Sequence, residues 1–276
     1  MGKIILLNTP IGNLGDLTPR VLEALKTGET FAVEDTRVFR DLLGHLGISF
    51  QGKRIMSLHD QSDDGQVDKL LEYAQSGDLY VASEAGSPIV SDPAYPLVVG
   101  AYNKGIKVES YSGVSSPIMA LELSGLPPIP FQFHGFLPRE SGKRKKAFQE
   151  AGYGTHIFFE APTRVEETLG ELAEVLPDVQ VAMVRELSKK FEQTVRFKAR
   201  DWETVKKDIM FKGEFIFLFH NAAASSSMMS GELKSLAQDI LENGSGPKQV
   251  SKLLSLILDR PTKEIYLYLS LNKRKE

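Results

Sequence analysis

Cysteine is absent from this chain of 276 residues, and its absence removes several kinds of chemistry at once. Disulfide bonds, thiolate metal sites, iron–sulfur clusters and cysteine nucleophiles are all excluded. Long hydrophobic runs are absent too, because no apolar segment reaches about 18 residues, the length of a membrane span. The chain begins MGKIILLNTP, which is typical of a strand and not of a charged leader with a cleavage site. We therefore expect a cytoplasmic protein without a membrane-spanning segment.

Several nucleotide, hydrolase and metal motifs are also missing. No G-x-G-x-x-G follows a strand-like segment, and neither G-x-x-x-x-G-K-[ST] nor G-x-S-x-G occurs, which disfavours a conventional dinucleotide fold, a P-loop and a serine hydrolase. The five histidines stand far apart, without the spacing of a metal site, so we expect no metal. A lone histidine is usually structural, but His59, beside Asp60, is the best candidate for a polar role in a site.

What is present indicates two globular domains. Hydrophobic residues make up 42% of the chain, which is enough for sizeable cores. The formal net charge of −3 is unevenly distributed: residues 1–135 carry 10 Lys and Arg against 16 Asp and Glu, and the remainder carries 23 against 20. A chain that is acidic overall does not hold nucleic acid through bulk charge, so any such partner has to be met by local basic patches.

Strand and helix signals alternate through residues 1–123. Apolar strand-like runs occur at residues 3–8, 30–33, 55–58, 79–82 and 107–111, and segments with helical spacing separate them. This alternation predicts an α/β domain whose mostly parallel sheet is covered on both faces.

A second block of the same class is expected at residues 124–222. Residues 124–139 contain four prolines and are interpreted as the passage between the domains. Strands follow at 156–160, 180–185 and 214–219, with a hairpin-like segment at 191–197 and helices at 144–149, 163–175 and 201–207. Residues 222–231 are a low-complexity linker, and amphipathic segments within 230–276 predict a small helical module.

The loops that follow the strands contain mostly small and polar residues. Residues 79–98, a strand followed by such a loop, are the main candidate for a ligand site. A strand that opens into a tight loop at its carboxyl end is where open α/β sheets bind ligands. In this loop Gly86 permits close backbone approach, and Ser83, Glu84, Ser87 and Asp92 supply polar groups. Similar loops occur at residues 9–16, 34–37, 112–117 and 160–164, and together they suit a ligand recognised largely through backbone groups.

A series of motifs carries a resemblance over roughly residues 3–220. They are, in order, TPIGNLGDLT, AVEDTRVFRDLL, SEAGSPIVSDPAY, GFLPRESGKRKK, FFEAPTRVEETL, VRELSKKFE and KGEF. Their order and spacing resemble the bacterial family that methylates the 2′-hydroxyl of a cytidine in small-subunit ribosomal RNA. That family belongs to the tetrapyrrole-methylase-like, or class III, methyltransferases that use S-adenosylmethionine.

The resemblance implies two α/β domains, a cofactor cleft between them and a homodimer acting on ribosomal RNA or the small ribosomal subunit. It implies that the cofactor S-adenosylmethionine is bound by Pro10, Gly86, Ser87, Ile89, Val90, Ser115, Ser116, Phe159, Met183 and Gly213. A 2′-hydroxyl must lose its proton during methyl transfer, and the candidates for the base are Asp35, Glu34 and His59. Asp35 ranks first because its EDTR motif matches the family without change.

The RNA side of the site is expected on basic residues: Arg37, Arg139, Lys143, Arg144, Lys145 and Arg164. Residues 139–146 hold five basic residues in eight and are the strongest local candidate for a polyanion contact, with a solvated charged turn as the alternative. Phe133, His134 and Phe136 add stacking if they are not core residues. The C-terminal helices are either an RNA-contacting module or a packing module.

Four departures from the family pattern leave the acceptor open. The usual S-D-A-G-T-P is changed at Glu84 and Ser87, the usual P-G-P-S has Val114, and the segment after His59 has Gln61 in place of the second histidine. Y-E-S-[PT]-H-R has become FEAPTR. Two alternatives therefore stand beside the ribosomal RNA reading: a related methylase of a small molecule or tetrapyrrole, and a non-catalytic protein that binds RNA or the ribosome.

Overall fold

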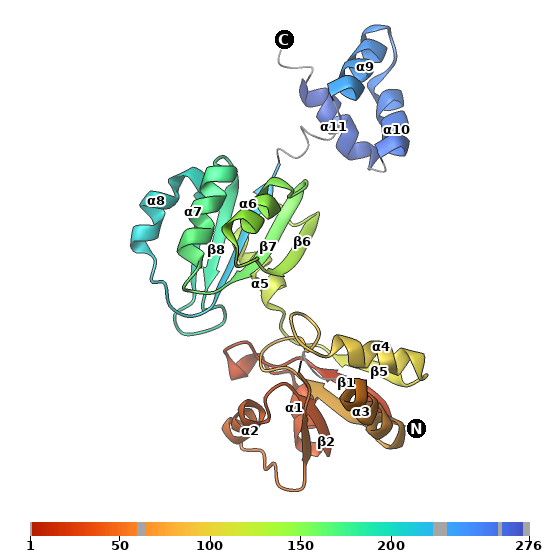
Figure 1. Ribbon diagram of the computed structural model, residues 1–276, viewed down its shortest axis with the longest axis vertical. Coiled ribbons are helices and arrows are strands. Elements are labelled where there is room, and N and C mark those ends of the chain that lie inside the picture. The colour runs from red at the N-terminus through yellow and green to blue at the C-terminus, as the bar shows by residue number, and fades with distance from the viewer. Residues whose placement is uncertain (1, 60–63, 223–230, 259–260, 273–276) are drawn as a thin grey trace.

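The computed structural model describes residues 2–59, 64–222, 231–258 and 261–272. Three bodies follow one another along the chain in Figure 1: an α/β body in red to yellow, a second α/β body in green to cyan, and a helical module in blue. The α/β class and the two sheets expected from the sequence are therefore confirmed.

The first sheet has five parallel strands in the order β3-β2-β4-β1-β5. The strands are β1 (Lys3–Leu7), β2 (Thr30–Val33), β3 (Arg54–Ser57), β4 (Leu79–Ala82) and β5 (Lys107–Tyr111). The connecting helices are α1 (Pro19–Thr27), α2 (Thr36–His45), α3 (Asp64–Ser76) and α4 (Tyr95–Asn103). All carboxyl ends of the strands meet at one edge of the sheet because every strand runs in the same direction.

Alternate residues of β1 point to opposite faces, and both faces are buried. Ile4 and Leu6 pack with residues of α3 and α4, whereas Ile5 and Leu7 pack with residues of α1 and α2. An apolar strand such as KIILL fits this position because each face has a helical cover. The expected doubly covered parallel sheet is confirmed.

The second sheet is mixed, with the order β6-β7-β10-β8-β9. Its strands are β6 (Phe131–Phe136), β7 (Gly154–Glu160), β8 (Gln180–Arg185), β9 (Gln193–Lys198) and β10 (Phe215–Asn221). The pair β6 and β7 is parallel and the other pairs are antiparallel. The expected passage at residues 124–139 is thus partly wrong, because β6 makes it an edge of this sheet; its prolines lie at or beyond the strand ends, where no ladder donor is needed.

Each face of the second sheet has its own helical cover. Helices α6 (Ser141–Gln149) and α7 (Val165–Val175) pack on one face, with the fully buried Phe148 and Leu172. Helix α5 (Ser116–Ser124) packs on the other face through Ala120 and Leu121. The sequence interpretation placed residues 116–123 with the first domain, whereas in the structure their apolar side chains cover the second sheet.

The segment expected as one helix at 201–207 is divided into short pieces. Helix α8 (Trp202–Val205) stands between 3₁₀ turns at Ala199–Asp201 and Lys206–Asp208. Trp202 explains the arrangement, because its buried ring stacks on Phe197 and its indole N–H donates to the Glu166 carbonyl at 3.2 Å.

The C-terminal module consists of α9 (Gly231–Glu242), α10 (Pro247–Leu258) and α11 (Thr262–Asn272). Ala237, Val250, Leu254, Ile265 and Leu269 form its own buried cluster. The expected linker lies almost wholly outside the described residues, at 223–230. Among the residues described, no helix has both the length and the apolar character needed to cross a bilayer.

Candidate functional site

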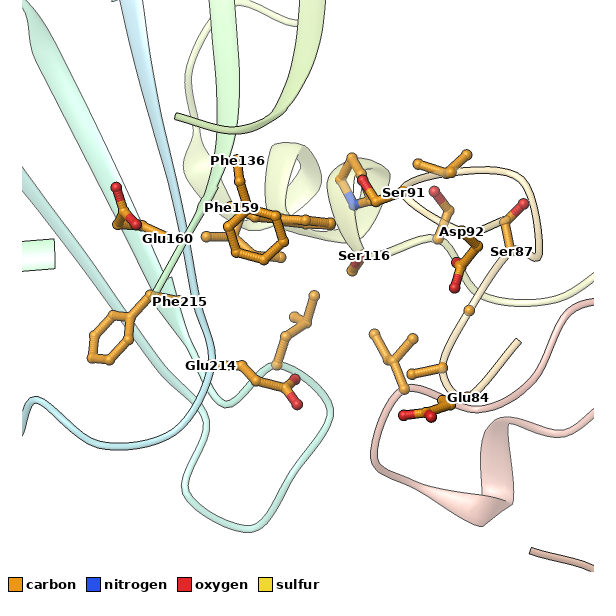
Figure 2. Close-up of a pocket in the computed structure, with 18 of the residues that line it drawn as sticks. Glu84, Ser87, Ser91, Asp92, Ser116, Phe136, Phe159, Glu160, Glu214 and Phe215 are labelled. Atoms are coloured by element: carbon orange, nitrogen blue, oxygen red, sulfur yellow. The ribbon is translucent and has the colours of Figure 1, made fainter. Parts of the chain in front are cut away.

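A cavity of about 510 Å³ lies between the two sheets. Its first wall consists of loops at the carboxyl edge of the first sheet, and its second wall is the face of the second sheet beside α5. Figure 2 shows the two walls opposite each other, with Glu84, Ser87, Ser91 and Asp92 on one side and Phe159 on the other. The volume lies within the range of small-molecule sites, roughly 300–1,000 Å³.

The polar wall is held by an interlocked pair of loops. Gly86 and Thr9 exchange backbone hydrogen bonds of 2.9 and 3.0 Å, and the Ser83 hydroxyl donates to the Gly86 carbonyl at 2.9 Å. Gly86 has a φ of +84°, and an added Cβ would lie 3.3 Å from the Ile11 side chain. Glycine is therefore needed here both for the backbone conformation and for the close approach of the two loops.

The N-terminus of α5 opens at the same wall. Ser115 is the N-cap residue of this helix, Ser116 and Pro117 begin its first turn, and all three line the cavity. The first N–H groups of a helix have no acceptor within the helix, so this end offers donors and partial positive charge.

The opposite wall is aromatic and aliphatic. Phe159 lies against Phe136, with ring centroids 5.5 Å apart, and Ile216 and Leu187 continue the apolar surface. Figure 2 places Phe136 and Phe159 together at the second sheet. A flat apolar wall facing a polar loop suits a ligand with a ring at one end and charged groups at the other.

Carboxylates also gather around the cavity: Glu34, Glu84, Asp92, Glu160 and Glu214. Glu160 is held by Arg164 at 2.6 Å, by the Thr168 hydroxyl at 2.9 Å and by the Ala161 N–H at 2.8 Å. Glu84 differs, because burial and then the negative charges of Glu34 and Asp35 raise its pKa. A carboxylate with a raised pKa at a cavity wall is a candidate for proton transfer.

Asp35, the first base candidate from the sequence, is a helix cap. Its Oδ1 accepts the Arg37 backbone N–H at 2.7 Å at the start of α2, and the Arg37 guanidinium donates to both of its oxygens. The side-chain bond from Arg37, followed by the backbone bond, lowers the pKa of Asp35 far below its usual range. This carboxylate is stabilised as an anion, which makes it a poor base.

The other two base candidates are in different places. Glu34 lines the cavity, as Glu84 does. His59 is exposed after the end of β3 and does not belong to the described cavity lining. Residues 60–63, which include Gln61, lie outside the described residues.

Most of the expected cofactor residues lie at one cavity. Its lining includes Gly86, Ser87, Val90, Ser115, Ser116, Phe159 and Gly213. Pro10 is buried immediately before the lining residue Ile11, and Ile89 packs into the core under α3 and α4. The prediction that Met183 binds the cofactor is not supported, because Met183 does not line the cavity and its buried side chain lies in the core on the other face of the second sheet.

The basic run at 139–146 is largely neutralised by its neighbours. Lys143 pairs with Glu140 at 2.9 Å, Lys145 with Glu174 at 2.6 Å, and Lys146 with Glu150 at 3.6 Å. Such exposed pairs are weak and can exchange for phosphate, so Lys143 and Lys145 remain candidates for RNA contact. Arg139 is exposed at the start of the run.

Arg144 and Arg164 have structural partners. The Arg144 side chain is 1% exposed, and its guanidinium pairs with Glu171 at 2.8 Å and Glu167 at 2.7 Å. The expectation that Arg144 contacts RNA is therefore wrong, because a buried and paired guanidinium cannot reach a phosphate. Arg164 pairs with Glu160 and donates to the Leu137 carbonyl at 3.3 Å, while keeping partial exposure beside the cavity wall.

The sequence reasoning does not include Glu84 among the candidates for the base, and of the apolar wall it names Phe159 as a cofactor residue but not Ile216, Leu187 or Ile11. It names Glu84 as a polar group of its loop and as a departure from the family pattern, although the position two residues after the buried strand β4 is a usable signal for a role in proton transfer. Ile216, Leu187 and Ile11 gave no signal of their own, because apolar residues that line a cavity have the same pattern as core residues. Within the described part of the chain, no cluster of three or more His, Asp or Glu side chains is arranged to hold a metal ion.

Comparisons with known proteins agree with this architecture. A sequence model of the family described as Tetrapyrrole (Corrin/Porphyrin) Methylases matches residues 3–203. A solved diphthine synthase has a similar fold, with a TM-score of 0.58 and 17% identity over 79% of this chain and 90% of that chain. Uroporphyrin-III C-methyltransferase from Thermus thermophilus, solved with S-adenyl homocysteine, is also similar in fold. Its TM-score is 0.51, and it is 19% identical over 79% of this chain and 97% of that chain. The chain belongs to the tetrapyrrole methylase family.

Several curated relatives are similar over nearly the full length. Ribosomal RNA small subunit methyltransferase I of Streptococcus pyogenes serotype M1 is 34% identical over 271 residues, which cover 96% of this chain and 93% of the relative. Within the tetrapyrrole methylases the chain is therefore grouped with these enzymes, and it is a methyltransferase.

Proposed function

We propose that the chain transfers the methyl group of S-adenosylmethionine to the 2′-hydroxyl of a cytidine in small-subunit ribosomal RNA. The observation that carries the proposal is the cavity, in which a polar loop of small residues faces an aromatic wall. The similarity to ribosomal RNA small subunit methyltransferase I supports the acceptor. The methylase of a small molecule and the non-catalytic RNA-binding protein are not favoured.

The chemistry of the cavity fits this donor. Adenine requires an apolar slot with hydrogen-bonding edges, which Phe159, Ile216 and the Gly86 loop would supply. A carboxylate suits the N-terminus of α5 at Ser115 and Ser116. The ammonium and sulfonium charges suit the surrounding carboxylates, and when bound the donor supplies a methyl group activated for in-line displacement without a metal.

The chain's own contribution is to position the acceptor and to remove its proton. We assign the base to Glu84, which lines the cavity and whose pKa is raised by burial and by the charges of Glu34 and Asp35. A raised pKa makes its carboxylate a stronger proton acceptor for a hydroxyl held within hydrogen-bonding distance. Glu34 lies at the same wall and keeps the local field negative.

The proposal includes a homodimer in the cytoplasm. The outer strand β6 and the segment before it expose apolar side chains: Ile129 is 81% exposed and Phe131 41%. An apolar edge strand favours pairing with another chain. Sedimentation of the full chain as a dimer, weakened by Phe131→Glu, is the expected result.

The first test is calorimetric binding of S-adenosylmethionine to the wild type, to Ser87→Trp and to Ser76→Trp. Ser87 lines the cavity, so the tryptophan should fill it and abolish binding, whereas exposed Ser76 ends α3 at the opposite edge of the first sheet. Failure of the wild type to bind would leave the non-catalytic reading in its place.

The second test uses small ribosomal subunits isolated from cells that lack the enzyme. Methyl transfer should protect one phosphodiester from alkaline cleavage, because a methylated 2′-oxygen cannot attack the adjacent phosphate. Methylation of a base without this protection would contradict the assigned acceptor atom.

A further inference from the structure

A second hollow lies on the outer face of α2, in the first domain. This groove, of about 550 Å³, is lined by Arg37, Arg40, Asp41, Gly44, His45 and Phe50. We call it the α2 groove. The sequence reasoning singled out only Arg37 among these residues.

Helical spacing explains why the groove forms. Residues three, four, seven and eight positions after Arg37 fall on one face of a helix, so Arg40, Asp41, Gly44 and His45 follow it in a stripe. Gly44 leaves this stripe open, because a Cβ added there would meet nothing within 4 Å. Phe50, in the loop after α2, closes the far side.

The stripe ends at the methyltransferase cavity. Glu34, which lines that cavity, lies three residues before Arg37, and the Arg37 guanidinium is close enough to Glu84 for their charges to interact. His45 is eight positions after Arg37, and in an α-helix eight positions span roughly 12 Å. The α2 groove therefore extends along the helix away from Glu84, the proposed base.

The groove combines cations with an aromatic ring. The Arg37 side chain is 84% exposed, so it retains outward N–H donors in spite of its pair with Asp35. The Arg40 guanidinium lies 5.9 Å from the centre of the Phe50 ring, and Phe50 is 46% exposed. Guanidinium groups bind phosphates, and exposed rings and guanidinium planes stack on unpaired bases.

His45 and Asp41 supply the remaining polar groups. The Nδ1 of His45 lies 2.8 Å from the Asp41 carbonyl oxygen, which can only accept, so Nδ1 carries the proton and neutral His45 presents Nε2 as an acceptor. The Asp41 carboxylate repels phosphate and accepts from exocyclic amino groups. The centre of the groove is therefore suited to bases and its arginines to phosphates.

We propose that the α2 groove binds a short single-stranded RNA segment adjacent to the nucleotide that enters the cavity. The inference rests on the proposed function for its direction and deepens it by naming how the acceptor strand is held. A protein partner is less suited, because the groove is small, charged and centred on one stacking ring.

Binding is tested without catalysis by fluorescence anisotropy, with a labelled single-stranded oligocytidylate as the probe. Arg40→Ala and Phe50→Ala should each weaken binding roughly tenfold, which is about the effect of losing the stacking of one base. Phe50→Tyr keeps an aromatic ring and should retain the binding. Arg20→Ala is the matched control for Arg40→Ala, since Arg20 also lies over an aromatic ring, that of Tyr111, the last residue of the other edge strand, β5.

Gly44→Glu places a charge and a side chain directly in the groove and should weaken binding by at least the same factor. Gly77→Glu is its control: Gly77 directly follows α3, a Cβ added there also meets nothing within 4 Å, and its change should leave binding as in the wild type. Thermal unfolding of each variant checks that the fold is retained.

The outcomes separate this inference from the proposed function. Suppose that the wild type binds S-adenosylmethionine and methylates small subunits, while Arg40→Ala, Phe50→Ala and Gly44→Glu bind RNA as tightly as their controls. This result would contradict RNA binding in the α2 groove and support the proposed function. If the wild type does not bind the cofactor but the groove variants still lose RNA affinity, the proposed methyl transfer is contradicted and RNA binding in the α2 groove is supported. A wild type that does not bind the probe also overturns the groove.

Discussion

The Arg37 guanidinium lies 2.6 Å from Oδ2 of Asp35, and the backbone N–H of Arg37 lies 2.7 Å from Oδ1 of the same side chain. The carboxylate thus caps α2 and pairs with the first turn of the helix at the same time. Both interactions favour its ionised form. A residue that ranks first as a base from its motif is for this reason reassigned to holding the loop at the cavity.

Replacing Asp35 separates these two roles. Asp35→Asn should retain most of the methyl transfer, because asparagine also caps a helix well, whereas Asp35→Ala should lower the melting temperature through loss of the cap. Loss of activity in Asp35→Asn with the fold intact would restore Asp35 as the base.

The effect of Asp35 on stability should depend on pH. Its pKa is lowered from an ordinary value of 3.8, so its contribution is present above that value and is lost as the pH falls toward the folded pKa. The difference in melting temperature between the wild type and Asp35→Asn should therefore shrink in acid. A difference that is constant with pH would contradict the ion pair.

Glu84→Gln should reduce kcat by roughly 10²- to 10⁴-fold while S-adenosylmethionine still binds, because only the proton acceptor is removed. In the wild type the rate should fall as the pH is lowered through the pKa of Glu84, which lies above the ordinary 4.5. Glu72→Gln, on the exposed face of α3, is the matched control and should leave the rate unchanged. Equal losses in both variants would remove Glu84 from the mechanism.

The contribution of Glu84 to stability should depend on pH in the opposite direction to that of Asp35, because the pKa of Glu84 is raised and that of Asp35 is lowered. A raised pKa means that Glu84 favours the folded state below 4.5 and that this contribution is lost as the pH rises through its folded value. At neutral pH Glu84→Gln should melt no lower than the wild type. Marked destabilisation would indicate that the ionised side chain holds the loop.

Arg144→Ala should destabilise the fold by about 3–5 kcal/mol, because it leaves Glu171 buried without its partner. Lys143→Ala, at the exposed neighbouring position, should change the stability by no more than about 0.5 kcal/mol. Denaturant unfolding measures both. A stable Arg144→Ala variant with weakened RNA binding would return Arg144 to the RNA surface.

Gly86→Ala should cost about 1–2 kcal/mol, because alanine at a φ of +84° is strained. It should also weaken S-adenosylmethionine binding, because the new Cβ presses on Ile11 at the cavity wall. Gly77→Ala, in open space, should not lower the melting temperature. Wild-type affinity in Gly86→Ala would argue against a close approach of the donor to this loop.

Much of the fold follows directly from sequence periodicity. The strands at Thr30–Val33, Leu79–Ala82, Lys107–Tyr111 and Gln180–Arg185 have the bounds that the apolar runs predict. The strand β6 could not be predicted in this way, because FQFHGF lies among prolines and its burial depends on β7, which follows later in the chain.

The sequence predicts which loops form the candidate site, but it does not predict which charged side chains are paired or have a shifted pKa. Gly86 and Ser115 lie in loops after strands, and the parallel direction of the strands alone brings such loops to one edge of the sheet. The pairing of Asp35 with Arg37 is local to the EDTR motif, whereas the raised pKa of Glu84 depends on burial and on Glu34 and Asp35, which lie about 50 residues earlier in the chain. For the same reason Arg144 was misread, because Glu171, on α7, neutralises it from outside the basic run.

The packing of α5 on the second sheet decides how the protein can be divided for separate expression. A fragment that ends at residue 123 would carry Ala120 and Leu121 into water without the sheet that covers them, and exposed apolar surface of this kind promotes aggregation. The complementary fragment would lack a cover over Ile216 and Leu218. A cut near Gly113 leaves each sheet with its own helices, so fragments for nuclear magnetic resonance or for reassembly of the two halves should be separated there.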